Sequence, residues 1–126
     1  MTSCASPTAL LAALLLAGGA EASPSNKWRL QFSGNSESSG SIVIRVTGNT
    51  AQPITVEVQI PFDKSENEVA EKVEIALDAV LPEEFYNVER DDGEDVLIKK
   101  RWFKENFEVL ILGNTVKGVR INLDKE

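Results

Sequence analysis

The sequence predicts an α+β fold, in which a mainly antiparallel sheet carries one amphipathic helix on one of its faces. Several short segments alternate apolar and polar residues, a period of two that is typical of half-buried strands. Residues 65–82 instead place apolar residues at spacings of three and four, the period of a helix. Counted along the chain, these segments give about seven strands in the order β-β-β-α-β-β-β-β.

The first residues are set apart from this domain. Residues 9–17 form an apolar run too short to cross a bilayer as a helix, and the small-residue pattern Ala20-Glu21-Ala22 follows it. This predicts a signal peptide at residues 1–22, a short linker at residues 23–27 and a single domain at residues 28–126. No Lys or Arg precedes the apolar run, and the alternative is an uncleaved hydrophobic tail. We expect an exported protein, periplasmic or secreted and of bacterial type, with no stable membrane insertion after cleavage.

The composition excludes several kinds of catalytic site. The sequence has no histidine, and cleavage would remove Cys4, its single cysteine. Without these side chains there is no Ser-His-Asp or Cys-His nucleophile and no zinc site of the usual ligands. Enzymes built on two carboxylates stay open, and a hydrolase of cell-wall polymers is the enzymatic alternative. We expect a non-enzymatic protein with no catalytic residues, no cofactor and no metal.

Three strands are predicted before the helix. Residues 28–32 and 42–46 alternate apolar and polar side chains, and residues 54–60 have the most regular period of two in the chain. The Gly- and Ser-rich segment at residues 34–41 contains no apolar residue. We expect this segment to be a mobile loop.

The predicted helix has well-defined ends. Ser65 can cap its first turn, while Glu68 reaches back to the amide of the cap. Pro82 cannot continue a helix. The acidic residues of the outer face suit the helix dipole, and we interpret this face as solvated. The apolar stripe that should face the sheet consists of Val69, Val73, Ala76, Leu77 and Val80.

A hairpin is predicted after the helix. Asp92-Gly93 separates two alternating segments, and both residue types tolerate the positive φ of a two-residue turn. This turn would place Arg90 opposite Asp95 as an ion pair. The carboxylates at the tip could attract calcium, but they lack the regular oxygen spacing of a calcium loop. We therefore interpret the segment as a turn.

One concentrated basic and aromatic segment follows, in a protein with a formal net charge of −7. Aromatic rings can stack on a ligand while cations attract it, so this segment is the candidate partner-binding site. An acidic glycan, a lipid headgroup or an acidic patch of a protein would suit it, and the acidic charge of the whole chain disfavours nucleic acid. The alternative is a strand end whose aromatic side chains enter the core. The candidate residues are Lys99, Lys100, Arg101, Trp102 and Lys104.

Residues 107–112 are apolar at nearly every position, and such a strand needs both of its faces covered. One helix can cover about three or four strands, so we expect either a second sheet behind the first or a symmetric dimer. The candidate self-association residues are Phe107, Val109, Leu110, Ile111 and Leu112.

These observations predict a small exported binding module that contacts a protein partner or an acidic envelope component, in an inhibitor-like or scaffolding role. The alternative is a structural subunit of an envelope, appendage or virion assembly, a homo-oligomer built through residues 107–112. The layout is similar to that of small exported modules of the cystatin or PepSY kind, in which one helix rests on a curled antiparallel sheet. Such domains more often inhibit, bind or scaffold than catalyse.

Overall fold

The computed structural model of the protein describes residues 24–48, 52–101 and 105–126. Seven strands and one helix form in this part of the chain, so the predicted α+β class is confirmed. The predicted signal peptide at residues 1–22 lies outside it. No helix of the described residues is long and apolar enough to cross a membrane. The elements are β1 (Lys27–Ser33), β2 (Gly40–Gly48), β3 (Ile54–Ile60), α2 (Glu66–Val80), β4 (Tyr86–Asp91), β5 (Asp95–Lys100), β6 (Phe107–Asn114) and β7 (Arg120–Lys125).

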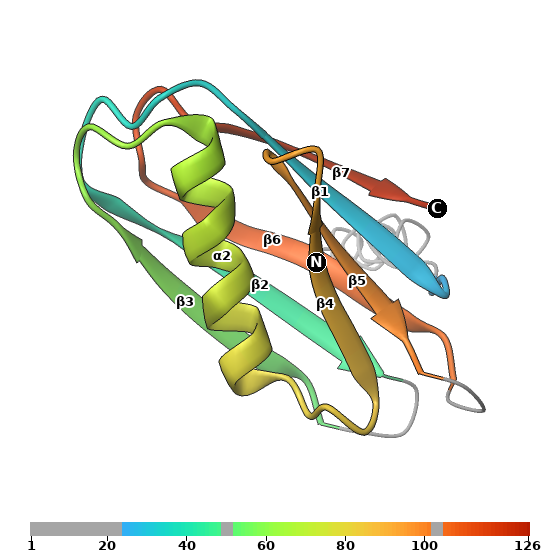
Figure 1. Cartoon of the computed structure of the whole chain (residues 1–126). Coiled ribbons are helices and arrows are strands. Elements are labelled where there is room, and N and C mark those ends of the chain that lie inside the picture. Colours follow the sequence, from blue (N-terminus) through green and yellow to red (C-terminus); the bar gives the residue numbers. More distant parts are fainter. Residues whose placement is uncertain (1–23, 49–51, 102–104) are drawn as a thin grey trace, which may run out of the picture.

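The strands divide between two antiparallel sheets (Figure 1). One sheet has the order β4-β5-β1-β7, and the other has the order β3-β2-β6. The sequence led to the expectation of one sheet with the helix on one face, and of either a second sheet or a symmetric dimer to cover the strands that the helix leaves bare. Two sheets take the place of the single one. The arrangement differs because one helix cannot cover seven strands, and the strands that α2 leaves bare are covered by the other sheet.

The core lies between the two sheets and α2. Alternate residues of β1, β2 and β3 are buried in it, as their period of two predicted. Helix α2 buries Val69, Ala70, Val73 and Leu77, whereas Val80, assigned to the same stripe from the sequence, is 49% exposed. The largest fully buried side chains include Leu30, Phe32, Ile42, Ile44, Ile60, Ile98 and Phe107.

The first turn of α2 has the predicted capping arrangement. Ser65 Oγ accepts a hydrogen bond from the Glu68 N–H at 3.3 Å, and the Ser65 N–H donates to Glu68 Oε1 at 2.9 Å. Both bonds satisfy backbone or side-chain groups that a helix start otherwise leaves to water. The bond from the Ser65 amide also holds the pKa of Glu68 below its ordinary value.

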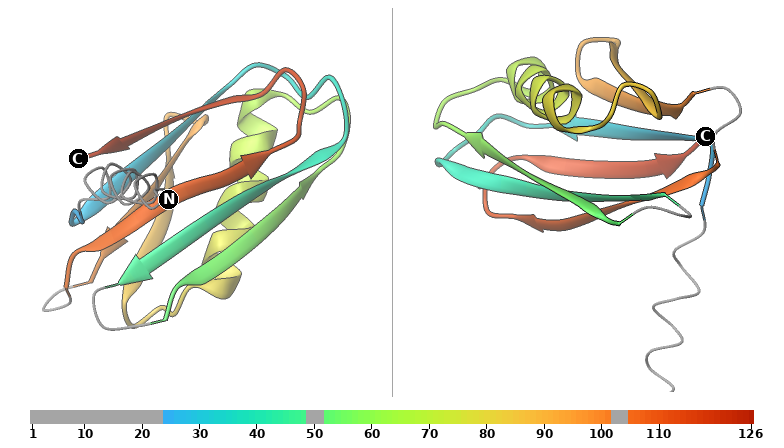
Figure 2. Two further views of the ribbon diagram at one scale, coloured as in Figure 1. Left: turned by 180° about the vertical axis from the view of Figure 1, so that it is seen from behind. Right: turned by 90° about the horizontal axis from the view of Figure 1, so that it is seen from below.

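The two sheets meet at two seams, where an edge strand of one sheet lies beside an edge strand of the other. Helix α2 contacts both β3 and β4 and closes the seam between them (Figure 1). Strands β6 and β7 form the second seam, on the side turned away from α2 (Figure 2, left). Among the described strands no ladder pairs β6 with β7. We call the space between their free edges the open seam.

The Gly- and Ser-rich segment between β1 and β2 is held in place by neighbouring loops, contrary to the mobile loop expected. Ser36 is 2% exposed, and its Oγ donates to Pro61 O and accepts from the Lys64 N–H, both at 2.7 Å. The Glu37 N–H donates to Lys117 O at 2.7 Å in the β6–β7 connection. The segment lacks apolar residues because its hydroxyl and backbone groups, rather than apolar contacts, join it to the loops on either side.

Candidate functional site

The β4–β5 hairpin forms with a register one residue away from the predicted one. Asp92 and Gly93 have φ values of 55° and 81°, as the predicted turn requires. The ladder pairs Asp91 with Asp95, however, and so Arg90 does not face Asp95. The predicted ion pair was therefore wrong, and two like charges lie opposite each other instead.

Arg29 of the neighbouring strand β1 binds these two aspartates. Its Nη1 lies 3.0 Å from Asp91 Oδ2 and also contacts Asp95 Oδ2, while its Nε lies 2.9 Å from Glu126 Oε2. Like charges that face each other across a ladder destabilise it, and the guanidinium offsets that repulsion. The hydrogen bonds to Glu126, Asp95 and Asp91 raise the pKa of Arg29 above its ordinary value, so the guanidinium stays charged.

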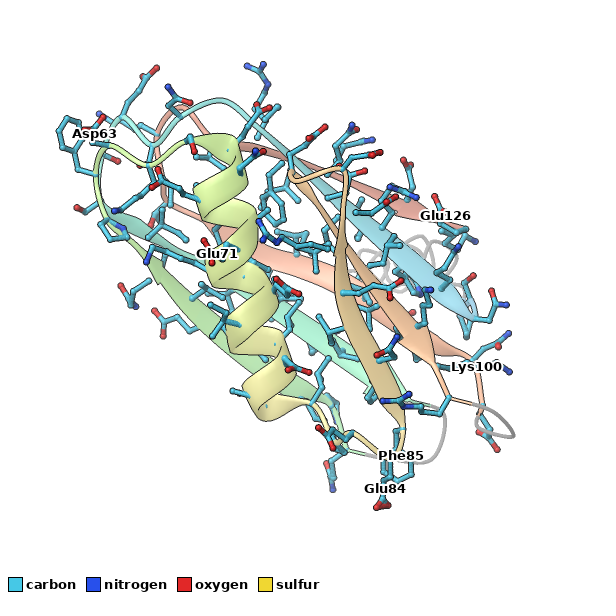
Figure 3. The ribbon with its side chains drawn as sticks, viewed as in Figure 1. Asp63, Glu71, Glu84, Phe85, Lys100 and Glu126 are labelled. Atoms are coloured by element: carbon cyan, nitrogen blue, oxygen red, sulfur yellow. The ribbon has the colours of Figure 1, made fainter. Side chains whose placement is uncertain are left out.

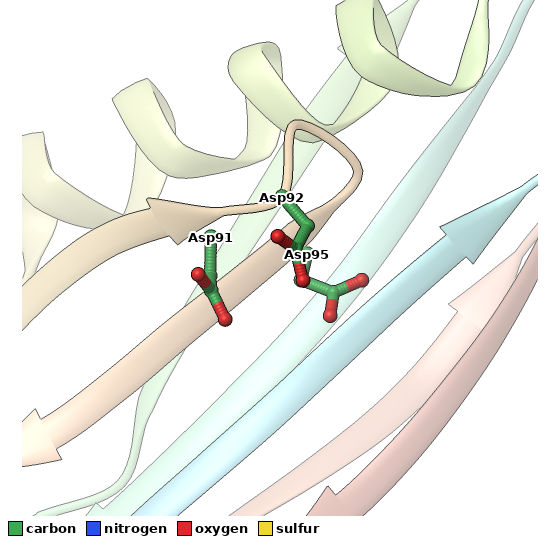
Figure 4. A group of neighbouring side chains, drawn as sticks. All are labelled: Asp91, Asp92 and Asp95. Carbon is green, nitrogen blue, oxygen red and sulfur yellow. The ribbon is translucent and has the colours of Figure 1, made fainter.

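The same hairpin tip contains the one group of carboxylates close enough to hold a metal ion among the described residues. Oxygens of Asp91, Asp92 and Asp95 lie within 4.8 Å of one another (Figure 4). Carboxylate oxygens are the ligands that calcium prefers. Arg29 already supplies positive charge to two of the three, and the buried Asp95 is 3% exposed. We therefore assign the cluster to the stability of the hairpin.

The basic and aromatic segment predicted to bind a partner is engaged by its own chain where the structure describes it. Lys99 Nζ lies 2.6 Å from Glu89 Oε2, and Arg101 Nε donates to Glu83 O at 2.9 Å. Lys100 lies at the end of the molecule that also holds Phe85 (Figure 3). Trp102 and Lys104 lie outside the described residues. Of the cationic side chains that would attract an anion, Lys99 is thus paired with a carboxylate and Arg101 is held by a backbone carbonyl.

The apolar strand β6 divides its side chains between the core and the surface. Phe107 and Val109 are fully buried, so a partner cannot reach their side chains in the folded protein. Leu110 and Ile111 are half-buried, and Leu112 is 49% exposed. Of the five predicted self-association residues, three therefore remain accessible to a partner.

The open seam contains a pocket with a volume of about 410 Å³. Its base is apolar and includes Trp28, whose Nε1–H donates to Phe107 O at 2.9 Å. Two carboxylates and one ammonium group stand around this base. The lining residues are Trp28, Glu108, Val109, Leu110, Leu123, Asp124 and Lys125.

One end of the open seam is closed by the chain segment that precedes β1. Ser25 forms an antiparallel bridge with Phe107, in which the Ser25 N–H donates to Phe107 O at 2.8 Å and the Phe107 N–H donates to Ser25 O at 2.9 Å. Ser25, which belongs to the predicted linker at residues 23–27, is joined to β6 by this bridge. The chain turns at Asn26 into β1, and among the described residues this one pair is the whole of the pairing between the segment before β1 and β6.

The sequence indicated β6 as a contact strand but not the other wall of the pocket. Leu123 and Trp28 show the period of two that any half-buried strand has, and nothing in that pattern distinguishes a residue beside an open edge. The pocket depends on which strands become sheet edges, which is a property of the whole topology. No family model matches this sequence, and no curated protein matches it.

Proposed function

We propose that this protein is a small exported, non-enzymatic binding module, and that its partner occupies the open seam. The observation that supports this most directly is the pocket between β6 and β7, which combines an apolar base with two free strand edges. Concave apolar sites with a few polar groups around them are the usual form of a binding site. The export part of the proposal rests on residues 1–22, as the sequence predicts.

The chemistry of the pocket favours binding over catalysis. Glu108 and Asp124 both line it, which is the carboxylate pair that a hydrolase would need. Hydrolases of this kind place the acid carboxyl group in a buried, apolar setting, whereas Asp124 is exposed and Glu108 is half-buried. Glu108 and Asp124 therefore form a charged rim around the apolar base of the pocket.

The structural-subunit alternative would use the outer face of β6. Leu112 is one of the few large apolar side chains that are extensively exposed among the described residues, and Leu110 is half-buried on the same strand. A second copy of the chain seated there would cover both. Light scattering at several concentrations separates the two proposals, because an assembly subunit forms a stable oligomer and a module for other proteins stays monomeric.

The experiment for the binding proposal is affinity capture from the envelope and medium of the source cells, with the chain from Ser23 as bait. Leu110→Lys alters the pocket lining, and Leu112→Lys is its matched control on the same strand outside the pocket. We expect the same captured protein with the wild type and Leu112→Lys and its loss with Leu110→Lys. Equal recovery by all three baits, with each bait folded by circular dichroism, would contradict the assignment of the site.

A further inference from the structure

We propose that the open seam takes an extended peptide segment of a partner protein as an added strand, antiparallel to β6, with lysine or arginine at alternate positions. This inference rests on the proposed function and names the kind of partner and its binding mode. Strand addition supplies affinity through main-chain hydrogen bonds, and pockets for alternate side chains supply specificity.

The free edge of β6 has its backbone groups directed into the open seam. Phe107 uses both its N–H and its C=O toward Ser25, so it faces away from β2. Backbone groups alternate in direction along an antiparallel strand. Val109 and Ile111 therefore also face away from β2, and along the described chain neither has a backbone partner on that side.

The free edge of β7, on the other side of the open seam, also directs backbone groups into it. The Glu126 N–H donates to Lys27 O at 2.9 Å, which fixes the alternation of the β1–β7 ladder. By that alternation the backbone groups of Leu123 and Lys125 face away from β1. A segment lying in the seam would thus meet unpaired donors and acceptors on both sides, and it would join the two sheets into one.

Ser25 shows that this edge of β6 accepts an antiparallel strand. Its bridge to Phe107 has two hydrogen bonds of ordinary length, and because the bridge is antiparallel the next ladder positions, toward Val109, lie on the side of the residues that precede Ser25. A peptide that enters beside Ser25 would continue the same ladder toward Val109 and Ile111. The direction of the added strand follows from this continuity.

The side-chain chemistry of the pocket defines the partner segment. Side chains of an added strand alternate between two faces. Those directed inward would lie over Trp28 and Leu123 at the base of the pocket, which favours apolar residues. Those directed outward would meet Glu108 and Asp124, neither of which forms an ion pair with a described residue, in a protein of net charge −7. Alternating apolar and cationic residues satisfy both faces.

The other two sheet edges are less suited to an added strand. Proline stands just before and just after β3, at Pro53 and Pro61, and proline disfavours strand pairing. Strand β4 lies against α2, and its Arg90 is tied to Glu74 of that helix at 3.1 Å. These features leave the open seam as the accessible edge.

The test uses the chain from Ser23, which keeps the whole core because the buried cluster runs from Trp28 to Val119. The probe is the blocked peptide Ac-KVKVKVK-amide, followed by shifts of backbone amide signals in nuclear magnetic resonance spectra. We expect the amides of Val109, Ile111 and Leu123 to shift and to become protected from hydrogen exchange. The same peptide with glutamate in place of lysine should bind about tenfold more weakly or less.

Two controls make the outcome specific. N-methylation of every second amide of the peptide removes half of its main-chain donors. Binding should be abolished when the methylated amides are those that face β6. Glu108→Lys should weaken binding of the lysine peptide, whereas Glu57→Lys, on the exposed face of β3 in the same sheet, should leave it unchanged. Any one of three results would overturn the proposal. They are undiminished binding of every N-methylated peptide, equal binding of the glutamate and lysine peptides, and the absence of a shift in the amide signals of Val109 and Ile111.

The remaining outcomes identify a different occupant. The Val109 amide could be protected from hydrogen exchange in the chain from Met1 and unprotected in the chain from Ser23. That result would assign the open seam to residues 1–22 and overturn the partner proposal. Protection that appears together with a dimer in light scattering would assign it to a second copy. A third outcome is that Leu110→Lys loses partner capture while none of the peptides produces a response. That result would support the binding module and overturn only the strand-addition mode.

Discussion

Gly34 and Gly118 lie backbone against backbone, and each has a φ of +88°. A Cβ atom on Gly34 would lie 2.0 Å from Gly118 O, and a Cβ atom on Gly118 would lie 2.3 Å from Asn35 O. Both loops carry the chain from one sheet to the other. The absence of side chains at this contact therefore sets how closely the two sheets can approach at this end.

Gly34→Ala should be strongly destabilising, because the methyl group meets a carbonyl oxygen and the backbone conformation favours glycine. We expect a loss of about 2 to 3 kcal/mol in the free energy of unfolding, measured by urea denaturation. Gly113→Ala is the matched control, since a Cβ atom there meets no atom within 4 Å. Similar urea midpoints for the two variants would contradict the contact.

Ser36→Ala should destabilise the protein by about 1 to 2 kcal/mol, because it removes the buried hydroxyl that bonds the part-buried Lys64 N–H and Pro61 O. Ser39→Ala is the control. Ser39 is exposed, and water can replace its hydroxyl as partner of the Phe62 N–H. The Lys64 amide should exchange its hydrogen faster in Ser36→Ala than in the wild type. Unchanged exchange would show that Ser36 does not hold the serine-rich segment against this loop.

Arg29→Met should cost about 2 to 3 kcal/mol, because it leaves the buried Asp95 carboxylate beside Asp91 without a counter-charge. Lys99→Met removes a more exposed ion pair with Glu89 and should cost less than about 1 kcal/mol. Urea denaturation of both variants gives the comparison. A loss for Arg29→Met no greater than that for Lys99→Met would mean that the cluster is not a stabilising feature.

Lowering the pH should reduce the free energy of unfolding, because Glu126 becomes protonated. The hydrogen bond from Arg29 holds the pKa of Glu126 below its ordinary value of 4.5. A carboxyl group whose pKa is lowered on folding stabilises the native state above its ordinary pKa, and this contribution disappears as the pH falls through the lowered pKa. Glu126→Gln should thus be less stable than the wild type at about pH 7, and this difference should shrink as the pH falls below 4.5 and through the lowered pKa of Glu126. A difference that stays the same over this pH range would contradict this linkage.

The sequence predicted the elements that depend on local rules. The capping box at Ser65 and the positive φ of Asp92 and Gly93 follow from which atoms neighbouring residues can reach. The pairing of Arg90 with Asp95 failed because three residues, not two, separate the paired Asp91 and Asp95, which shifts the register by one and places Arg90 opposite Val96. Arg90 binds Glu74 of α2, and only the tertiary fold brings that helix beside β4.

The candidate site could be predicted only in part for the same reason. Residues 107–112 were correctly selected as a strand with apolar residues on more than one face, and Leu112 is exposed as an assembly or binding surface requires. The pocket itself needs Trp28 from β1 and Leu123 from β7, which are far from β6 in sequence. Periodicity assigns a residue to a face of its own strand and carries no information on which strand ends a sheet.

The bridge at Ser25 has one more consequence. Ser25 Oγ donates to Glu126 O at 3.3 Å, and the Glu126 N–H is bound to Lys27 O, so the first and last strands are fastened to each other where the chain enters and leaves the fold. A short peptide link between Glu126 and Ser25 would make the backbone circular without moving either sheet. The chain can then be cut in another exposed turn, such as Asp92-Gly93, to give a permuted protein with the same architecture whose new ends lie away from the open seam.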